Sequence, residues 1–375
     1  MTALRRVFAL ATLAIVVASP ASAALYDDVF VFGDSLSDGG NAFLLSNGFP
    51  PYPGSDPAPG VPAPFSGRVT NGPTAAEVLA LNPAINGTTI FPSIFGGTNY
   101  AVAGAATREY VNVPGSPAPG NVLPPPIMTT SNQIARGYWY LDDSVVDTPQ
   151  NLNINGLRSQ GIAQQVNGFA ATPPSFNANS SLFMLWGGAN DFFIDAPTAP
   201  AGAQNMVSFV ETLYGAGARN FLIPNLPNLA LTPFGQSLSP TDQAGLSFLS
   251  SQFNAALDLG IQTLRATKGD IHIVEVHVDN FLAALVTNPG ALTALGFDPA
   301  LAFTPCVSAS TLSVCADPDA HVFWDELHPT AKAHAVLGEY FAESLLAPVP
   351  EPSTWAMLGS GLLLLIVAGG LKRRT

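Results

Sequence analysis

The chain has 375 residues, of which 47% are apolar, and its formal net charge at pH 7 is −13. This apolar content is enough for one large buried core. Only thirteen residues are Lys or Arg, and five of them lie at the two ends: Arg5, Arg6, Lys372, Arg373 and Arg374. The rest of the chain therefore has few cations and a net negative charge, which repels phosphate backbones. This excludes nucleic acid as a partner.

The N-terminus has the three parts of a secretory signal peptide. A pair of arginines forms the charged start, residues 7 to 19 are apolar except for Thr12 and the final serine, and residues 21 to 23 read Ala-Ser-Ala, a cleavage pattern. A buried N-terminal helix is the alternative. We predict a signal peptide over residues 1 to 23 and a mature chain that begins at Ala24.

Strand-like and helix-like segments alternate along the body. Short apolar runs predict strands at residues 28 to 33, 99 to 105, 181 to 188, 219 to 225 and 270 to 276. Helix formers predict helices at residues 74 to 82, 157 to 171, 203 to 217, 241 to 267 and 330 to 346. Strands separated by helices indicate a parallel sheet covered on both faces. The expected fold is therefore α/β, a three-layer α/β/α sandwich with a central, mostly parallel five-stranded sheet, in one domain over residues 24 to 348.

Two proline-rich segments interrupt this alternation. Residues 50 to 64 hold seven prolines and residues 112 to 126 hold six, which excludes regular helix and central strand. We expect surface loops. The alternative is a rim or lid over a pocket, because binding elements often lie on loops that a rigid scaffold holds.

The stretch VFGDSLSDGGN, residues 31 to 41, places Ser35 directly after the first strand. Ligands of open α/β sheets bind at the carboxyl ends of the strands, so Ser35 is expected at the binding edge. A serine hydroxyl is a weak nucleophile that needs a general base within hydrogen-bond reach. The candidate base is His328 in the stretch FWDELHPT, and Asp325, three residues earlier, is placed to orient its imidazole.

Attack on a carbonyl also creates an oxyanion, which needs preorganised donors. Asn190 in the stretch GGAND offers a side-chain amide, and Gly104 in the stretch AVAGA offers a backbone N–H. The backbone N–H of Ser35 is the third candidate. Asn190 has an alternative interpretation as a helix cap. The other histidines lack a carboxylate at a comparable spacing and are interpreted as structural: His272, His277, His321 and His334.

These motifs, GDSL at residues 33 to 36, the glycine of NYAVAGA, GAND at residues 188 to 191 and DELHP at residues 325 to 329, resemble those of the SGNH/GDSL hydrolase family in order and context. The resemblance implies a flavodoxin-like fold and a serine hydrolase of the esterase or lipase type without cofactor. It implies Ser35 as nucleophile, His328 as base and Asp325 as its orienter, with Ser35, Gly104 and Asn190 as oxyanion donors. Expected substrates are small-molecule, lipid or sugar esters. An acyltransferase that uses the same acyl-enzyme, and a non-catalytic surface or matrix protein, are the alternatives.

The chain has two cysteines, Cys306 and Cys315. In an exported protein a close pair is expected to form a disulfide, whereas two free buried thiols are the alternative. A metal site would need more ligands, and the five histidines are scattered along the sequence. We therefore predict a disulfide and no metal.

The C-terminus combines three features. The stretch VPEPSTW begins at residue 349, twenty residues without a charge run from Pro352 to Leu371, and three basic residues follow. Twenty such residues are long enough to span a bilayer. The arrangement resembles the PEP-CTERM sorting signal, which implies a Gram-negative bacterium, processing by an exosortase and transient membrane anchoring. We therefore expect a sorting segment over residues 349 to 375 and a location in the periplasm, on the cell surface or in the extracellular matrix.

Overall fold

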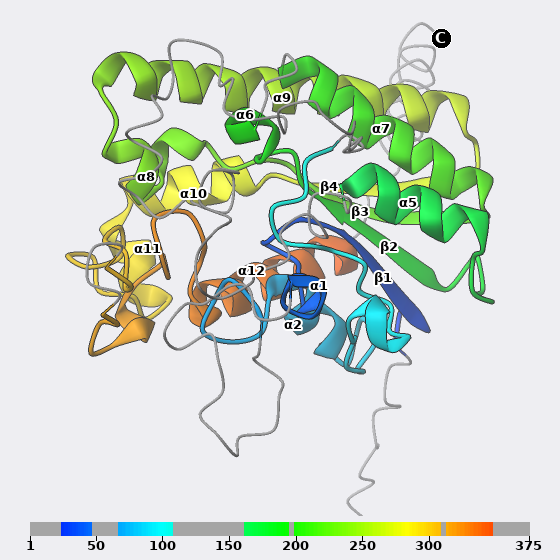
Figure 1. The fold of residues 1–375 in the computed structure, drawn as a ribbon, viewed down its shortest axis with the longest axis horizontal. Helices are drawn as coiled ribbons and strands as arrows, with labels where there is room; N and C mark the ends of the chain where they lie inside the picture. Colours follow the sequence, from blue (N-terminus) through cyan, green and yellow to red (C-terminus); the bar gives the residue numbers. More distant parts are fainter. Residues whose placement is uncertain (1–23, 47–66, 108–160, 195–198, 309–312, 348–375) are drawn as a thin grey trace, which may run out of the picture.

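The computed structural model describes residues 24–46, 67–107, 161–194, 199–308 and 313–347 (Figure 1). The predicted signal peptide, both proline-rich segments and the predicted sorting segment lie outside these ranges. Among the described residues, no helix is both long and apolar enough to cross a membrane.

A parallel sheet of four strands forms the centre of the described structure, with the strands in chain order across it. The first three strands are short runs of mostly buried apolar residues, as expected for parallel strands covered on both faces, whereas the last strand is only partly buried. The register pairs Gly33 with Trp186, so the first two strands end side by side. The strands are β1 (Asp28–Gly33), β2 (Ser181–Trp186), β3 (Asn220–Pro224) and β4 (His272–Val276).

Helices cover both faces of this sheet, which confirms the predicted three-layer α/β/α arrangement (Figure 1). One face packs against α5 (Ile162–Ala171), α7 (Ala199–Gly215) and α9 (Pro240–Thr267). The other packs against α2 (Ala75–Leu81), α10 (Val278–Thr287) and α12 (Ala331–Leu346). The shorter helices are α1 (Asn41–Ser46), α6 (Asp191–Ile194), α8 (Pro233–Gln236), α11 (Pro289–Ala294), η1 (Ser93–Phe95), η4 (Leu229–Leu231) and η5 (Pro318–Ala320).

The fifth predicted strand, residues 99 to 105, differs from the prediction. It lies beside β1 and bonds to it through Tyr100 and Val102, whose N–H groups donate to the carbonyls of Val31 and Gly33 at 2.7 and 3.1 Å. The ladder does not continue into a regular strand, because the Gly33 N–H donates to the Gln165 side chain instead. The segment still occupies the far side of β1 from β2. After β1 the chain first adds a neighbour on one side of this strand and then adds β2 on its other side. Open α/β sheets bind ligands at such a change in strand order.

His334 on α12 is a buried polar group between the two helices of one outer layer. Its Nδ1 accepts the Ala75 N–H of α2 at 3.1 Å, so the ring is neutral. Burial, and to a lesser extent His328, lowers the pKa of His334 from 6.5 to about 3. The neutral ring contributes stability that is present above pH 6.5 and is lost as the pH falls toward 3, because the unfolded chain binds the proton more readily.

We expect His334→Asn, which retains a hydrogen-bond acceptor, to reduce the loss of stability between pH 6.5 and 3. The slope of the free energy of unfolding against pH should differ between the variant and the wild type by nearly one bound proton, which corresponds to about 1.4 kcal/mol per pH unit. Chemical denaturation at a series of pH values measures it, with His272→Asn as the control, because that histidine is exposed. Parallel stability curves for His334→Asn and the wild type would contradict this assignment.

Candidate active site

Ser35 lies just beyond the end of β1, and Gly33 fixes where that strand ends. A Cβ atom at position 33 would lie 2.2 Å from the Trp186 carbonyl oxygen, so glycine is required where β1 and β2 approach. The Gln165 side chain of α5 accepts the Gly33 N–H and donates to the Gly33 carbonyl, both at 2.9 Å. The helix therefore holds the strand end from which Ser35 projects.

Asp34 shapes the turn that presents Ser35. Its carbonyl oxygen accepts the N–H groups of Ser37 and Asp38 at 3.1 and 3.0 Å. Its Oδ1 accepts the Leu36 N–H at 3.1 Å. Burial raises the pKa of Asp34 to about 7, although the Leu36 N–H and His328 act to lower it. A buried carboxyl that titrates near neutral pH therefore lies next to the candidate serine.

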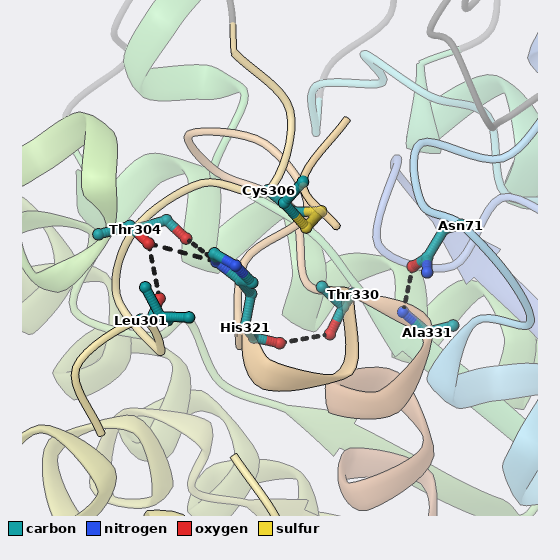
Figure 2. Close-up of a disulfide and its surroundings, with 8 residues drawn as sticks. Asn71, Leu301, Thr304, Cys306, His321, Thr330 and Ala331 are labelled. Atoms are coloured by element: carbon teal, nitrogen blue, oxygen red, sulfur yellow. Dashed lines mark hydrogen bonds between the residues drawn. A yellow bond between two sulfur atoms is a disulfide. The ribbon is translucent and has the colours of Figure 1, made fainter. Parts of the chain in front are cut away.

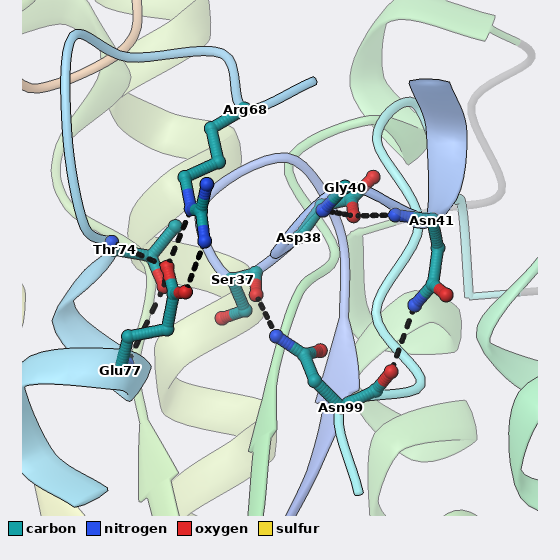
Figure 3. A network of polar contacts seen from close by, with 8 residues as sticks. All are labelled: Ser37, Asp38, Gly40, Asn41, Arg68, Thr74, Glu77 and Asn99. Carbon is teal, nitrogen blue, oxygen red and sulfur yellow. Dashed lines mark hydrogen bonds and ion pairs between the residues drawn. The ribbon is translucent and has the colours of Figure 1, made fainter. Parts of the chain in front are cut away.

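Asp38 joins this turn to the segment that precedes Gly104 (Figure 3). Its carboxylate accepts four backbone N–H groups at 2.6 to 3.0 Å: those of Gly40, Asn41, Ala42 and Ala103. Burial raises the pKa of Asp38 to about 6, and the same four donors lower it. The carboxylate therefore both caps α1 and braces the turn.

Asn99 and Asn41 strengthen the same connection (Figure 3). The Asn99 side chain donates to the Ser37 carbonyl at 2.8 Å, and the Asn41 side chain donates to the carbonyls of Asn99 and Ala101 at 2.8 and 2.9 Å. All three amide and carboxyl side chains are buried, so these bonds satisfy groups that water does not reach.

The structure brings Ser35, His328 and Asp325 into one hydrogen-bonded chain. The Ser35 Oγ lies 2.8 Å from the His328 Nε2, and the His328 Nδ1 lies 2.7 Å from the Asp325 Oδ2. The other carboxylate oxygen of Asp325 accepts the backbone N–H groups of Leu327 and His328. Burial alone would lower the pKa of His328, but Asp325 and then Asp34 raise it, and the net pKa lies above its usual value. A neutral imidazole in this position can accept the hydroxyl proton of Ser35.

A short hairpin carries Asp325 and His328. The Trp324 N–H donates to the His328 carbonyl at 2.7 Å, and the Thr330 N–H donates to the Val322 carbonyl at 2.9 Å. Thr330 also caps α12 through its hydroxyl, which accepts the Ala333 N–H. The hairpin thus ends directly in a helix that packs on the sheet.

A disulfide between Cys306 and Cys315 lies beside this hairpin, as the sequence predicted (Figure 2). The N–H groups of Cys306 and Val307 donate to the carbonyls of Phe323 and Trp324 at 3.1 and 2.7 Å. Trp324 is buried against the two cysteines. The disulfide-closed loop therefore bonds to the two residues that immediately precede Asp325.

Asn190 and Gly104, the other two candidate residues, lie on loops that are bonded to each other. The Asn190 Nδ2 donates to the Ala105 carbonyl at 3.1 Å. Asp191 accepts both the N–H and the hydroxyl of Thr107, at 2.8 and 2.7 Å. Gly104 has a φ of 80°, a backbone conformation that favours glycine. Within the part of the chain that the structure describes, the backbone N–H groups of Ser35 and Gly104 have no hydrogen-bond acceptor.

A cavity opens at this cluster. Ser35, Asn190 and His328 line it, whereas Gly104 is not among its lining residues and Asp325 lies behind His328. Trp186 also lines it, and its indole donates to the Asn225 carbonyl at 3.2 Å. The structure therefore places a hydroxyl, an imidazole and an amide in the lining of one cavity.

One residue that shapes this site, Gln165, was not predicted from the sequence. Gln165 is separated from Gly33 by 132 residues, and a glutamine in a helix carries no local signal of such a contact. Asp34 stood within the GDSL motif, but its burial depends on residues that follow much later.

His321 is buried, with Nδ1 2.8 Å from the Thr304 carbonyl oxygen (Figure 2). The described residues contain no group of three or more His, Cys, Asp or Glu side chains suited to a metal.

Comparisons with known proteins identify the family. The family model described as GDSL-like lipase/acylhydrolase matches residues 29–341, and the model of the PEP-CTERM protein-sorting motif matches residues 348–374. The second match confirms the predicted sorting motif at the C-terminus.

Individual relatives belong to the same group. GDSL esterase/lipase At1g73610 of Arabidopsis thaliana is 26% identical over 338 residues, which cover 85% of this chain and 89% of the relative. GDSL esterase/lipase At3g50400 of the same plant is 26% identical and covers 83% and 85% of the two chains. A crystal structure of a lipolytic protein G-D-S-L family member from Veillonella parvula is 15% identical, with a TM-score of 0.31, and the match covers 51% of this chain and 75% of that chain.

We expect reduction of the disulfide to disturb His328 before it unfolds the domain, because the disulfide-closed loop bonds directly to Phe323 and Trp324. The proton on the His328 Nδ1 can be followed by NMR and identified by its absence in His328→Asn. Both signals are followed on one sample as reductant is added. The NMR signal of this proton should disappear at a lower reductant concentration than the one at which the far-UV circular dichroism signal is lost.

A variant with both Cys306→Ser and Cys315→Ser is the control. It should show the disturbed signal without reductant and should not respond to reductant. Simultaneous loss of the NMR signal and of secondary structure in the wild type would make the disulfide a general stabiliser of the domain.

Proposed function

Because the chain belongs to the GDSL-like lipase/acylhydrolase family, we propose that it is an exported serine hydrolase that cleaves carboxylic esters through an acyl-enzyme on Ser35. One observation carries the proposal. The Ser35 Oγ lies 2.8 Å from the His328 Nε2, while the Nδ1 of the same ring lies 2.7 Å from the Asp325 carboxylate. This is the arrangement that a serine nucleophile, its general base and an orienting carboxylate need.

In the proposed first half-reaction, the Ser35 Oγ attacks the ester carbonyl carbon and its proton passes to the His328 Nε2. The tetrahedral intermediate then breaks its bond to the alcohol, which leaves with the proton from Nε2. Asp325 keeps the Nδ1–H in place throughout, and its charge stabilises the imidazolium that forms between the two steps. Water repeats the sequence in the second half-reaction and releases the carboxylic acid.

The oxyanion would be bound by the backbone N–H groups of Ser35 and Gly104 and by the side-chain amide of Asn190. The two backbone groups have no acceptor within the described residues, so they are available to a ligand. Asn190 is buried and held by Ala105, which restricts its rotation. Donors that are fixed before the reaction stabilise the developing charge without reorganisation.

The proposed location rests on the two ends of the chain. The sorting motif at residues 348–374 indicates an exported protein of Gram-negative bacteria. We propose that residues 1 to 23 direct export, and that the C-terminal segment anchors the chain transiently until an exosortase-type enzyme processes it. The enzyme would then act in the periplasm, on the cell surface or in the extracellular matrix.

Ser35→Ala and His328→Ala should each lower kcat/KM for p-nitrophenyl butyrate by about 10⁴-fold or more, and the double variant should be hardly worse. The loss should not be additive because the two side chains act in one proton transfer. Steady-state kinetics on the purified mature chain measure it.

His277→Asn is the control, because this half-exposed histidine does not line the cavity and should leave kcat/KM unchanged. If the effects of the two single changes multiplied in the double variant, Ser35 and His328 would not share a mechanism.

A further inference from the structure

The cavity that Ser35 lines is polar only in part of its lining. Within the described ranges its polar lining residues are Asp34, Ser35, Asn190, Thr232 and His328, and the other lining residues there are apolar. Four of these five are at or next to the proposed reacting groups. The hydroxyl of Thr232 is already used, because it donates to the Leu229 carbonyl at 2.7 Å and accepts the Gly235 N–H at 3.1 Å.

Two helices supply much of the apolar wall. On α10 the lining residues are Val278, Phe281, Leu282 and Leu285, which have the spacing of one helical face. Seven residues of helix correspond to about 10 Å, so this face follows the cavity for a considerable length. On α12 the lining residues Ala333, Val336 and Leu337 have the same kind of spacing.

The polar side of α10 faces elsewhere. Asp279 accepts a hydrogen bond from the Asn225 side chain at 2.8 Å and does not line this cavity. The helix therefore presents a continuous apolar stripe to the cavity and its charged group to a different environment. A space lined by apolar side chains along a helix face fits a flexible hydrocarbon chain.

Phe297 marks one boundary of the cavity. Its ring lines the space, and the Lys332 ammonium lies 5.0 Å from the centre of the same ring. The ammonium also donates to the Asp319 carbonyl at 3.1 Å, so it is held by polar groups beyond the ring. Phe297 thus separates the apolar space from a charged region, and an alkyl chain could not pass it without moving the ring.

The lining also excludes other acyl groups and ligands. Among the described residues no Lys or Arg lines the cavity, so a carboxylate or phosphate buried against them would lack a counter-charge. Sugar hydroxyls in the apolar part would lose their bonds to water without replacement, which is unfavourable. A methylene chain, in contrast, gains free energy from burial in proportion to its length.

We infer that this cavity is the acyl-binding site, and that the substrates are esters of unbranched fatty acids whose length is limited by Phe297. The inference rests on the proposed function, because it assigns the acyl half of the ester that Ser35 would attack. It places the alcohol half outside the cavity, on the solvent side of Ser35.

The test is the dependence of kcat/KM on acyl length, measured with p-nitrophenyl acetate, butyrate, hexanoate, octanoate, decanoate and dodecanoate. In the wild type kcat/KM should rise by about fourfold for each added methylene group until the chain fills the cavity, and should then fall. Acetylated glucose and acetylated xylan should be poor substrates.

Two substitutions should move the optimum in opposite directions. Ala333→Leu adds volume inside the cavity and should shift the optimum to shorter chains, lowering the ratio of octanoate to acetate hydrolysis by at least about tenfold. Ala335→Leu is the matched control, because it makes the same change on the same helix at a residue that does not line the cavity. Its profile should match the wild type. Phe297→Ala should extend the optimum to longer chains.

The outcomes separate the two levels of the proposal. A flat profile, a preference for acetylated sugars, or identical profiles for Ala333→Leu and Ala335→Leu would overturn the acyl site, provided that hydrolysis still requires Ser35. Hydrolysis that survives Ser35→Ala would overturn the proposed function itself. Thermal melting shows whether each variant folds. If one variant does not fold, the acyl-length profiles of the wild type and of the other variant still test the proposed acyl-binding site.

Discussion

The hydrogen bond between the Ser35 Oγ and the His328 Nε2 joins two residues that are 293 positions apart in the sequence. A hydroxyl and an imidazole meet at 2.8 Å only if both backbones are held to a few tenths of an ångström. On one side, Gly33 is fixed between β2 and Gln165. On the other, the hairpin around Asp325 is bonded to the disulfide-closed loop and ends in the capped helix α12. Much of the polar structure near the site serves these two supports.

Buried carboxylates recur in these supports, and each is satisfied by backbone donors. Asp38 accepts four N–H groups, and Asp325 accepts two in addition to the imidazole. A buried carboxylate without partners would be strongly destabilising, whereas one that is bonded to several amides holds those amides in one geometry. The Arg68 guanidinium and Glu77 carboxylate, with the Thr74 cap of α2, form a similar buried group nearby (Figure 3). The site is thus built on loops, and buried carboxylates hold these loops in one geometry through hydrogen bonds to their backbone N–H groups.

The sequence was sufficient where the signal was local. Apolar runs identified the four strands of the sheet to within two residues at each end, and helix formers located the main helices, although α7 starts at Ala199, four residues before the prediction. The motifs around Ser35 and Asn190 were recognisable because short polar turns after strands have characteristic residues, and the motif around Asp325 because it directly precedes a helix. The disulfide was predictable because the two cysteines are close in an exported chain.

What could not be predicted depends on contacts between distant segments. The strand expected at residues 99 to 105 stops pairing with β1 because the Gly33 N–H donates to the side chain of Gln165 on α5. The helix α10 was not among the predicted helices, and periodicity could not have shown that its apolar face lines a cavity. The same limit applies to the raised pKa of Asp34, which arises from burial by the completed fold.

The central claim, that Ser35 is the nucleophile activated by His328, is tested most directly by covalent labelling. A fluorophosphonate reacts with a serine whose hydroxyl has been activated, and mass spectrometry of the digested protein identifies the modified residue. We expect one phosphonyl group, on the peptide that contains Ser35, formed rapidly in the wild type and very slowly in His328→Ala. Labelling of a different serine, or equal rates in the two proteins, would contradict it.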